Sequence, residues 1–237
     1  MFTQKAKIYT TSAALALAVA LAGSVAQAAL TVSAAVGGSP TGSIYDNFNS
    51  LALGNAAQVS STGIGVSFAP DGQVVQGATA QNAAPYLSNN NGALFGDANG
   101  ADTSNYLSAG IGQVILDFSS LGPQQYLGLL WGSVDAYNTL DFYNGNTLVG
   151  SIVGTDFWPG ANGDQGVNGT YYVNVSSTLD FNKVVASSSQ YAFEIDNVSY
   201  NNNGGPGGQE VPEPATLALF GLGLAGLGVM ARRRKPD

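Results

Sequence analysis

Short apolar stretches recur between residues 29 and 200, separated by Gly, Asn, Pro and Ser at intervals of roughly 8 to 14 residues. No long window shows the 3.6-residue periodicity of an amphipathic helix. Spacing of this kind predicts an all-β fold, and about ten strands fit an antiparallel, jelly-roll-like β-sandwich. We therefore expect residues 29–200 to form one β-sandwich body.

Several segments have clear strand patterns. Residues 114–118 alternate between apolar and mixed positions, as a half-buried strand does. Residues 126–134 are apolar on both alternating sets and predict a central strand. Residues 140–143 and 148–153 flank Asn144-Gly145, a pair that favours the type I′ turn of a β-hairpin. Further candidate strands are 30–36, 44–48, 64–68, 73–77, 171–175, 183–186 and 191–196, whereas the Asn-, Gly- and Ala-rich segment 81–104 is predicted to be a long surface loop.

The N-terminus, residues 1–28, has the pattern of a secretory signal peptide. Lys5 and Lys7 precede an uncharged, alanine-rich run, and Ala26 and Ala28 supply the small residues of an A-x-A cleavage site. We expect signal peptidase to cut after Ala28, so that the body is exported.

The C-terminus predicts a temporary membrane anchor. An Asn/Gly-rich stretch at residues 201–210 is typical of a flexible linker and leads into a tail at residues 211–237. Residues 215–231 carry no charge, and a helix of this length would be about 25 Å long, short for a hydrocarbon core of about 30 Å. Basic residues directly after this span orient it with the basic end in the cytoplasm and the body outside. This basic end comprises Arg232, Arg233, Arg234 and Lys235.

The tail resembles the PEP-CTERM sorting signal of Gram-negative bacteria, because a Pro-Glu-Pro motif, a glycine-rich span and an arginine cluster follow one another at the end of the chain. The motif is Val211, Pro212, Glu213 and Pro214, and its prolines deny it regular structure. The resemblance implies that an exosortase, a membrane-embedded transpeptidase-like enzyme, cuts near the motif and removes the span. It implies an inner-membrane-anchored precursor and then a protein at the cell surface or outside the cell. Similar tails are also named after ice-binding proteins, a name that describes the shared tail.

The body carries a second resemblance. Residues 45–49, 131–143 and 193–200 are similar to the ends and core of a family of exosortase-dependent surface proteins. The first and last of these segments also resemble jelly-roll modules of the galactose-binding type. The resemblance implies a sandwich fold at the cell surface and transfers no activity.

Composition excludes several functions. Residues 29–209 hold one cation, Lys183, against twelve acidic residues, a net charge of −11. Such a surface cannot neutralise phosphates, which excludes DNA and RNA as partners. The chain has no cysteine and no histidine, so thiol nucleophiles, common zinc sites and Ser-His-Asp triads are excluded. Without disulfides, the body must be held together by its own core.

Two acidic residues are candidates for a structural calcium site, and no other cofactor is expected. Asp46 and Asp196 lie near the first and last strands, which pair in many jelly rolls, so their carboxylates could meet around an ion. The alternative is that each caps a strand end or faces solvent. Residues 97–102 have an Asp at each end but lack the carboxylate ladder and final Glu of an EF-hand.

Exposed aromatic residues are the candidates for ligand binding. Trp158, predicted on a loop, with Tyr137 and Tyr143, could stack on sugar rings of an exopolysaccharide. A glycoside hydrolase would need two carboxylates around the scissile bond, and the body has a single Glu, Glu194. We therefore expect a non-enzymatic surface or biofilm-matrix protein; the alternatives are a carbohydrate-binding module and, less favoured, a secreted glycoside hydrolase.

Overall fold

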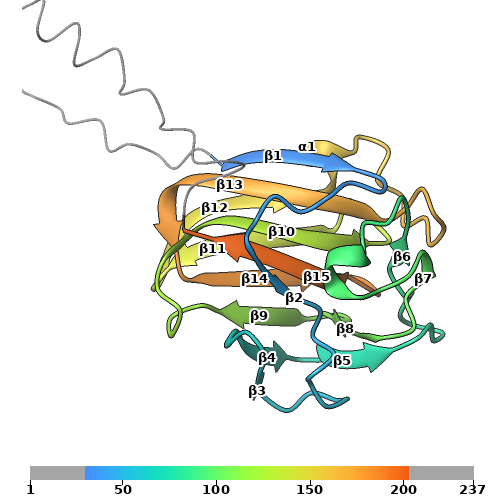
Figure 1. The fold of residues 1–237 in the computed structure, drawn as a ribbon, viewed down its shortest axis with the longest axis horizontal. Coiled ribbons are helices and arrows are strands. Elements are labelled where there is room, and N and C mark those ends of the chain that lie inside the picture. Colours follow the sequence, from blue (N-terminus) through green and yellow to red (C-terminus); the bar gives the residue numbers. More distant parts are fainter. Residues whose placement is uncertain (1–29, 203–237) are drawn as a thin grey trace, which may run out of the picture.

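Two antiparallel sheets packed face to face make up the body in the computed structural model, which describes residues 30–202 (Figure 1). One sheet has seven strands in the order β1-β13-β10-β15-β8-β5, and β2 also pairs with β15. Its strands are β1 (Leu30–Ala35), β2 (Ile44–Asp46), β5 (Gln73–Gln76), β8 (Asn105–Ser108), β10 (Gln124–Gly132), β13 (Tyr171–Phe181) and β15 (Glu194–Asn201).

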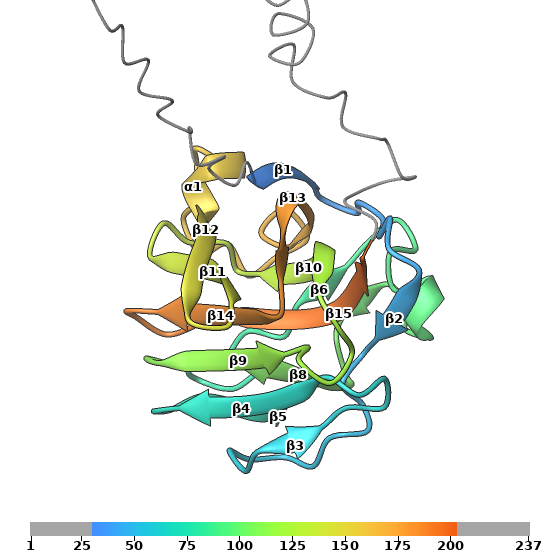
Figure 2. The same cartoon turned by 90° about the vertical axis from the view of Figure 1, so that its left-hand side faces the viewer.

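The second sheet has six strands in the order β12-β11-β14-β9-β4-β3. In Figure 2, β11, β14 and β9 lie to the left of β10, β15 and β8. The strands of this second sheet are β3 (Gln58–Val59), β4 (Gly65–Ala69), β9 (Gln113–Asp117), β11 (Asn138–Asn144), β12 (Thr147–Val153) and β14 (Lys183–Ser188). A separate two-stranded pair consists of β6 (Tyr86–Leu87) and β7 (Gly100–Ala101). The helical turns are η1 (Ala93–Phe95) and α1 (Gly154–Phe157). The predicted antiparallel β-sandwich is confirmed.

The core lies between the two sheets and is rich in aromatic side chains. Trp131 is fully buried and stacks on Phe193 with ring centroids 4.3 Å apart, and Phe118 packs edge-on against Phe181 at 6.3 Å. Every residue of β10 from Tyr126 onward is buried, because this strand lies between β13 and β15 and is covered on both faces. The predicted central strand is therefore confirmed.

The predicted hairpin at residues 140–153 is present, with its turn one residue later than expected. Asn144 pairs with Thr147, which leaves Gly145 and Asn146 as the two turn residues. Gly145 has a φ of 59°, and Asn146 does not have a positive φ. A positive φ at the first turn position alone defines a type II′ turn rather than the predicted type I′ turn.

The prediction of a surface loop at residues 81–104 is wrong in part. This segment contains β6, η1 and β7, and it buries Leu87 and Phe95 against Leu130 and Tyr172 on the outer face of the seven-stranded sheet. Figure 2 shows the green η1 turn on the far side of β2 from the six-stranded sheet. The segment shows no hydrophobic periodicity because most of its residues are small or carry amides, and its large buried apolar side chains are only Leu87 and Phe95.

Both ends of the described chain lie at the same end of the seven-stranded sheet, where β1 begins and β15 finishes. Thr31 pairs with Ser176, Ser176 with Tyr126 and Tyr126 with Asn201, so these residues form one row across four strands. The two ends are therefore about 14 Å apart, at about 4.8 Å per strand. The first residue of β15, Glu194, lies at the opposite end of the sheet, where it pairs with Gly132.

The predicted signal peptide and the predicted transmembrane span lie outside the described residues. Within residues 30–202, no helix has the length and apolar character needed to cross a membrane.

Candidate functional site

A polar groove opens at the edge of the sandwich opposite to the chain ends. It consists of a hollow of about 190 Å³ and a neighbouring one of about 250 Å³, which share Gln81 and Tyr191. The first hollow is lined chiefly by Gln81, Ser133, Asp135, Tyr137, Tyr191 and Glu194, and the second by Asn55, Asp71, Gln73, Gln81 and Tyr191.

The groove forms where the chain crosses between the two sheets. Ser133, Asp135 and Tyr137 lie on the connection from β10 to β11, and Ser133 has a φ of 42°. Tyr191 lies on the connection from β14 to β15, three residues before Glu194, the first residue of the last strand. Segments distant in sequence thus place their polar side chains around one depression.

Glu194 forms the buried floor of the groove. Its side chain is 1% exposed, and its Oε1 accepts a hydrogen bond of 2.9 Å from the backbone N–H of Ala83 while its Oε2 accepts one from the Ser133 hydroxyl. Burial raises the pKa of Glu194 to about 7, although these hydrogen bonds favour the ionised form and oppose the rise. Its carboxyl therefore changes charge near neutral pH.

Asp135 and Tyr137 form one wall. Asp135 is 7% exposed, and burial raises its pKa, while a hydrogen bond with Tyr137 lowers it. The Tyr137 hydroxyl donates to the backbone oxygen of Tyr191 at 3.3 Å. The Tyr191 ring itself is 42% exposed, so the groove combines an accessible aromatic ring with carboxyl and amide groups.

The three predicted ligand-binding aromatic residues occupy separate surfaces, and only Tyr137 lines the groove. Trp158 follows α1 and stacks on Tyr171 with ring centroids 5.2 Å apart, half-buried against the core. Tyr143 lies on β11, with the Lys183 ammonium 4.9 Å from its ring centroid. The structure does not bring these rings together, and their role in ligand binding stays a prediction.

The two predicted calcium ligands lie on paired strands but have different neighbours. β2 pairs with β15, with Asp46 opposite Val198. The Asp46 carboxylate accepts hydrogen bonds from the backbone N–H of Phe48 at 2.9 Å and from the backbone and hydroxyl of Thr62 at 3.1 and 2.6 Å. Asp196 is fully buried, and neither of its carboxylate oxygens has a hydrogen-bond partner.

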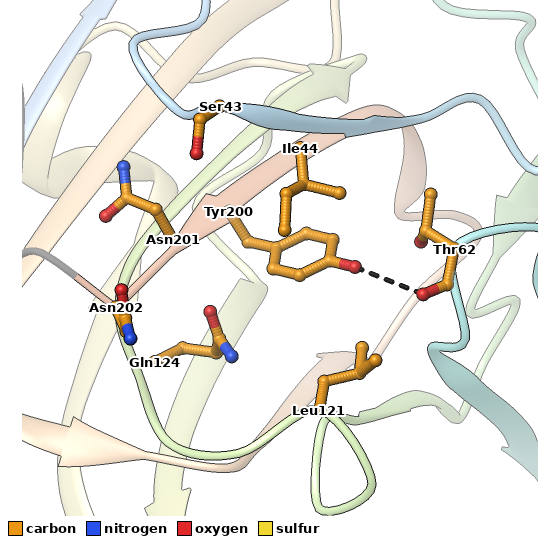
Figure 3. A pocket seen from close by; sticks show the side chains of 8 residues that line it. All are labelled: Ser43, Ile44, Thr62, Leu121, Gln124, Tyr200, Asn201 and Asn202. Carbon is orange, nitrogen blue, oxygen red and sulfur yellow. Dashed lines mark hydrogen bonds between the residues drawn. The ribbon is translucent and has the colours of Figure 1, made fainter.

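A larger hollow of about 390 Å³ lies where β15 ends. Figure 3 shows Tyr200 at its centre, with the phenol pointing to the backbone oxygen of Thr62, to which it donates at 3.4 Å. Ile44 and Leu121 supply apolar walls, and no charged side chain lines this hollow. It lies beside the point where the described chain ends at Asn202.

The fold and the C-terminal sequence together define an antiparallel β-sandwich protein with a C-terminal sorting region. A family model described as the PEP-CTERM protein-sorting motif matches residues 210–235. The chain carries this sorting motif at its C-terminus, which indicates a protein that is exported and sorted by an exosortase to the cell surface. The matched range includes the predicted motif at residues 211–214 and the predicted basic end at residues 232–235. No curated protein and no solved structure gives a significant match.

Sequence reasoning missed most of the groove. Gln81, Asp135 and Tyr191 have no shared local pattern, and only the tertiary fold brings them together. Glu194 offered a weak signal, because it is the single Glu of the body.

Proposed function

We propose that this protein is a non-enzymatic component of the cell surface or of the extracellular matrix. Its β-sandwich is held outside the inner membrane by the C-terminal span until an exosortase cuts near residues 212–214. The observation that carries this proposal is the sorting motif at residues 210–235 directly after a body with its own core.

The geometry of the body supports this arrangement. Residues 203–214 separate the described chain from the predicted span at residues 215–231, and twelve residues reach at most about 43 Å when fully extended. The end of β15 that contains Asn201 is therefore tethered within this distance of the membrane while the span is in place. β15 is eight residues long, roughly 25 Å, so the polar groove at its other end lies on the side of the body away from the tether.

Replacing Pro212, Glu213 and Pro214 together by Ala in the full chain, expressed in a host with an exosortase, tests the sorting step. We expect a larger precursor to accumulate in the membrane fraction, because the processing enzyme loses its motif. A matched control replaces Gly204, Gly205 and Pro206 by Ala, outside the matched range, and should be processed normally. If the motif variant reached the same location with the same size as the unaltered chain, the proposal would fail.

A second candidate function is binding of an exopolysaccharide in the polar groove. The exposed ring of Tyr191 offers a stacking face for a sugar, and Gln81 and Asp135 offer acceptors and donors for its hydroxyl groups. We rank sugar binding below the surface role because of the size of the groove. Its two hollows are each smaller than the roughly 300 Å³ of ordinary ligand pockets.

A glycan array and a pull-down with the producer's own polysaccharide test this second function. We expect Gln81→Ala and Tyr191→Ala to weaken binding at least about tenfold, the loss of about 1.4 kcal/mol. Tyr143→Ala is the control, because its ring lies on the other sheet beside Lys183. Absence of any bound glycan, or equal losses in all three variants, would rule the groove out as a sugar site.

The arrangement of the two groove carboxyls favours a binding role over hydrolysis. Glu194 accepts hydrogen bonds from two protein donors and is 1% exposed, whereas a general acid must reach the leaving oxygen of its substrate. Assays of the full chain on polysaccharides, repeated with Asp135→Asn, test this directly. Turnover that the variant loses would replace the proposal with a hydrolase.

A further inference from the structure

Two neighbouring side chains on β15 are buried without partners. Asp196 is 0% exposed, and both of its carboxylate oxygens lack a hydrogen bond. Asn197 is also 0% exposed, and neither its Oδ1 nor its Nδ2 makes one. Buried polar groups are almost always paired with protein groups, water or ions, because leaving them unpaired is costly. These two side chains therefore require a partner.

A β-bulge places them on the outer face of the seven-stranded sheet. The register pairs Gly128 with Ser199 and Leu130 with Asp196, so two residues of β15 oppose one residue of β10. Asn197 takes up the extra residue with a φ of 49°, as in bulges that re-aim a side chain. Without the bulge, the strand alternation that puts the Ile195 side chain in the core would also put the Asn197 side chain there.

Two further carboxylates reach this point from the segment at residues 81–104. Asp102 is 4% exposed; its Oδ1 accepts hydrogen bonds from the backbone and hydroxyl of Ser104 at 2.7 and 2.6 Å, while its Oδ2 is buried and unpaired. The Asp102 carboxyl lies within reach of that of Asp196. Asp97 follows η1, has a buried, unpaired Oδ2 and lies beside the Asn197 amide.

We call these four side chains, Asp97, Asp102, Asp196 and Asn197, the carboxylate cluster. No basic residue neutralises it, because Lys183, the one basic residue among residues 30–202, lies over Tyr143 on the six-stranded sheet. Burial raises the pKa of Asp196 well above its usual range, and the neighbouring Asp102 raises it further. Burial also raises the pKa of Asp97. Protons or a cation must supply the missing positive charge.

We propose that the carboxylate cluster binds one Ca²⁺ ion, which fastens the segment at residues 81–104 to β15. The available donors are carboxylate and amide oxygens, the ligands that Ca²⁺ prefers, and Ca²⁺ tolerates the irregular geometry of side chains from different segments. Asp97 is half-buried, which leaves the ion a route from solvent.

Binding must also draw the cluster together. Within the described residues, no three His, Cys, Asp or Glu side chains are already spaced to hold a metal ion. Asp102, on the segment at residues 81–104, lies close to Asp196 on the sheet. Asp97 belongs to the same segment, whose only strands, β6 and β7, have two residues each. Closure of Asp97 onto the ion would couple calcium binding to docking of this segment.

Thermal unfolding of the full chain in mild detergent, with added CaCl₂ or with EGTA, tests the proposal. At a calcium concentration about a hundred times the dissociation constant, Tm should rise by about 5–10 °C over its value in EGTA. Asp196→Asn should abolish this rise, and Asp97→Asn, which alters a half-buried residue and disturbs folding least, should reduce it. Equilibrium dialysis should find one Ca²⁺ per chain.

Two control variants separate calcium binding from general destabilisation. Asp46→Asn alters a buried carboxylate that already accepts three hydrogen bonds, so Tm should fall while the response to calcium stays. Asp180→Asn alters an exposed carboxylate and should change neither. The proposal is overturned if calcium and EGTA leave Tm unchanged, which would mean that the carboxyls share protons, or if Asp97→Asn responds to calcium as the unaltered chain does.

Discussion

Glu194→Gln tests the electrostatics of the polar groove through the stability of the whole domain. Glutamine has the shape of glutamate, and its oxygen can accept from the Ala83 backbone while its amide donates to the Ser133 hydroxyl. The substitution therefore removes an ionisable group from the buried floor of the groove and keeps its two contacts.

The expected effect follows from the raised pKa of Glu194, about 7 in the folded chain against an ordinary value of 4.5. A carboxyl with a raised pKa binds its proton more tightly in the folded than in the unfolded chain. Its contribution therefore favours folding below pH 4.5, and it is lost as the pH rises from 4.5 to 7. Over this interval the loss is about 3 kcal/mol of unfolding free energy.

Urea unfolding of the full chain at pH 4.5 and pH 8, with EGTA present throughout, measures this effect. Relative to the unaltered chain, Glu194→Gln should gain about 3 kcal/mol of unfolding free energy between the two pH values. The other buried carboxyls are common to both proteins and cancel in the comparison. Asp180→Asn, on an exposed residue, is the control. Parallel profiles for Glu194→Gln and the unaltered chain would refute the reasoning.

Two substitutions test the core and the hairpin. Trp131→Ala removes a fully buried side chain that stacks on Phe193 at 4.3 Å, and we expect urea unfolding to show a loss of about 3–5 kcal/mol; a loss below about 1 kcal/mol would contradict its central place. Gly145→Ala forces a side chain into a turn position with a φ of 59°, and the same measurement should show a loss of about 1 kcal/mol, whereas an unchanged stability would contradict the type II′ turn.

The class of fold followed from local patterns in the sequence. The spacing of apolar stretches predicted the sandwich, the doubly apolar run at residues 126–134 predicted its central strand, and Asn144-Gly145 located the hairpin to within one residue. The sorting signal was equally local, since three unlike elements follow one another in residues 211–235 and the family model matches there. Signals of this kind need no partner elsewhere in the chain.

The strand β8 and the segment at residues 81–104 were beyond such reasoning. β8 is four residues long and begins with Asn105, so it has too few positions for a periodic pattern. Residues 81–104 are held by the side chains of Leu87 and Phe95 and by scattered hydrogen bonds, such as that from Ala83 to Glu194, against distant parts of the chain. The Asn-, Gly- and Ala-rich composition of this segment therefore indicated a loop, because the contacts that decide its conformation are made with residues far away in the sequence.

The sequence by itself thus determined where the protein is sent and what class of fold it adopts. The polar groove and the carboxylate cluster were decided by the tertiary structure. Crossings between the sheets bring Asp135 beside Glu194, and one extra residue in β15 turns Asn197 toward Asp97. Strand register and bulges set which side chains meet, and both are fixed only when the sheets pair and pack.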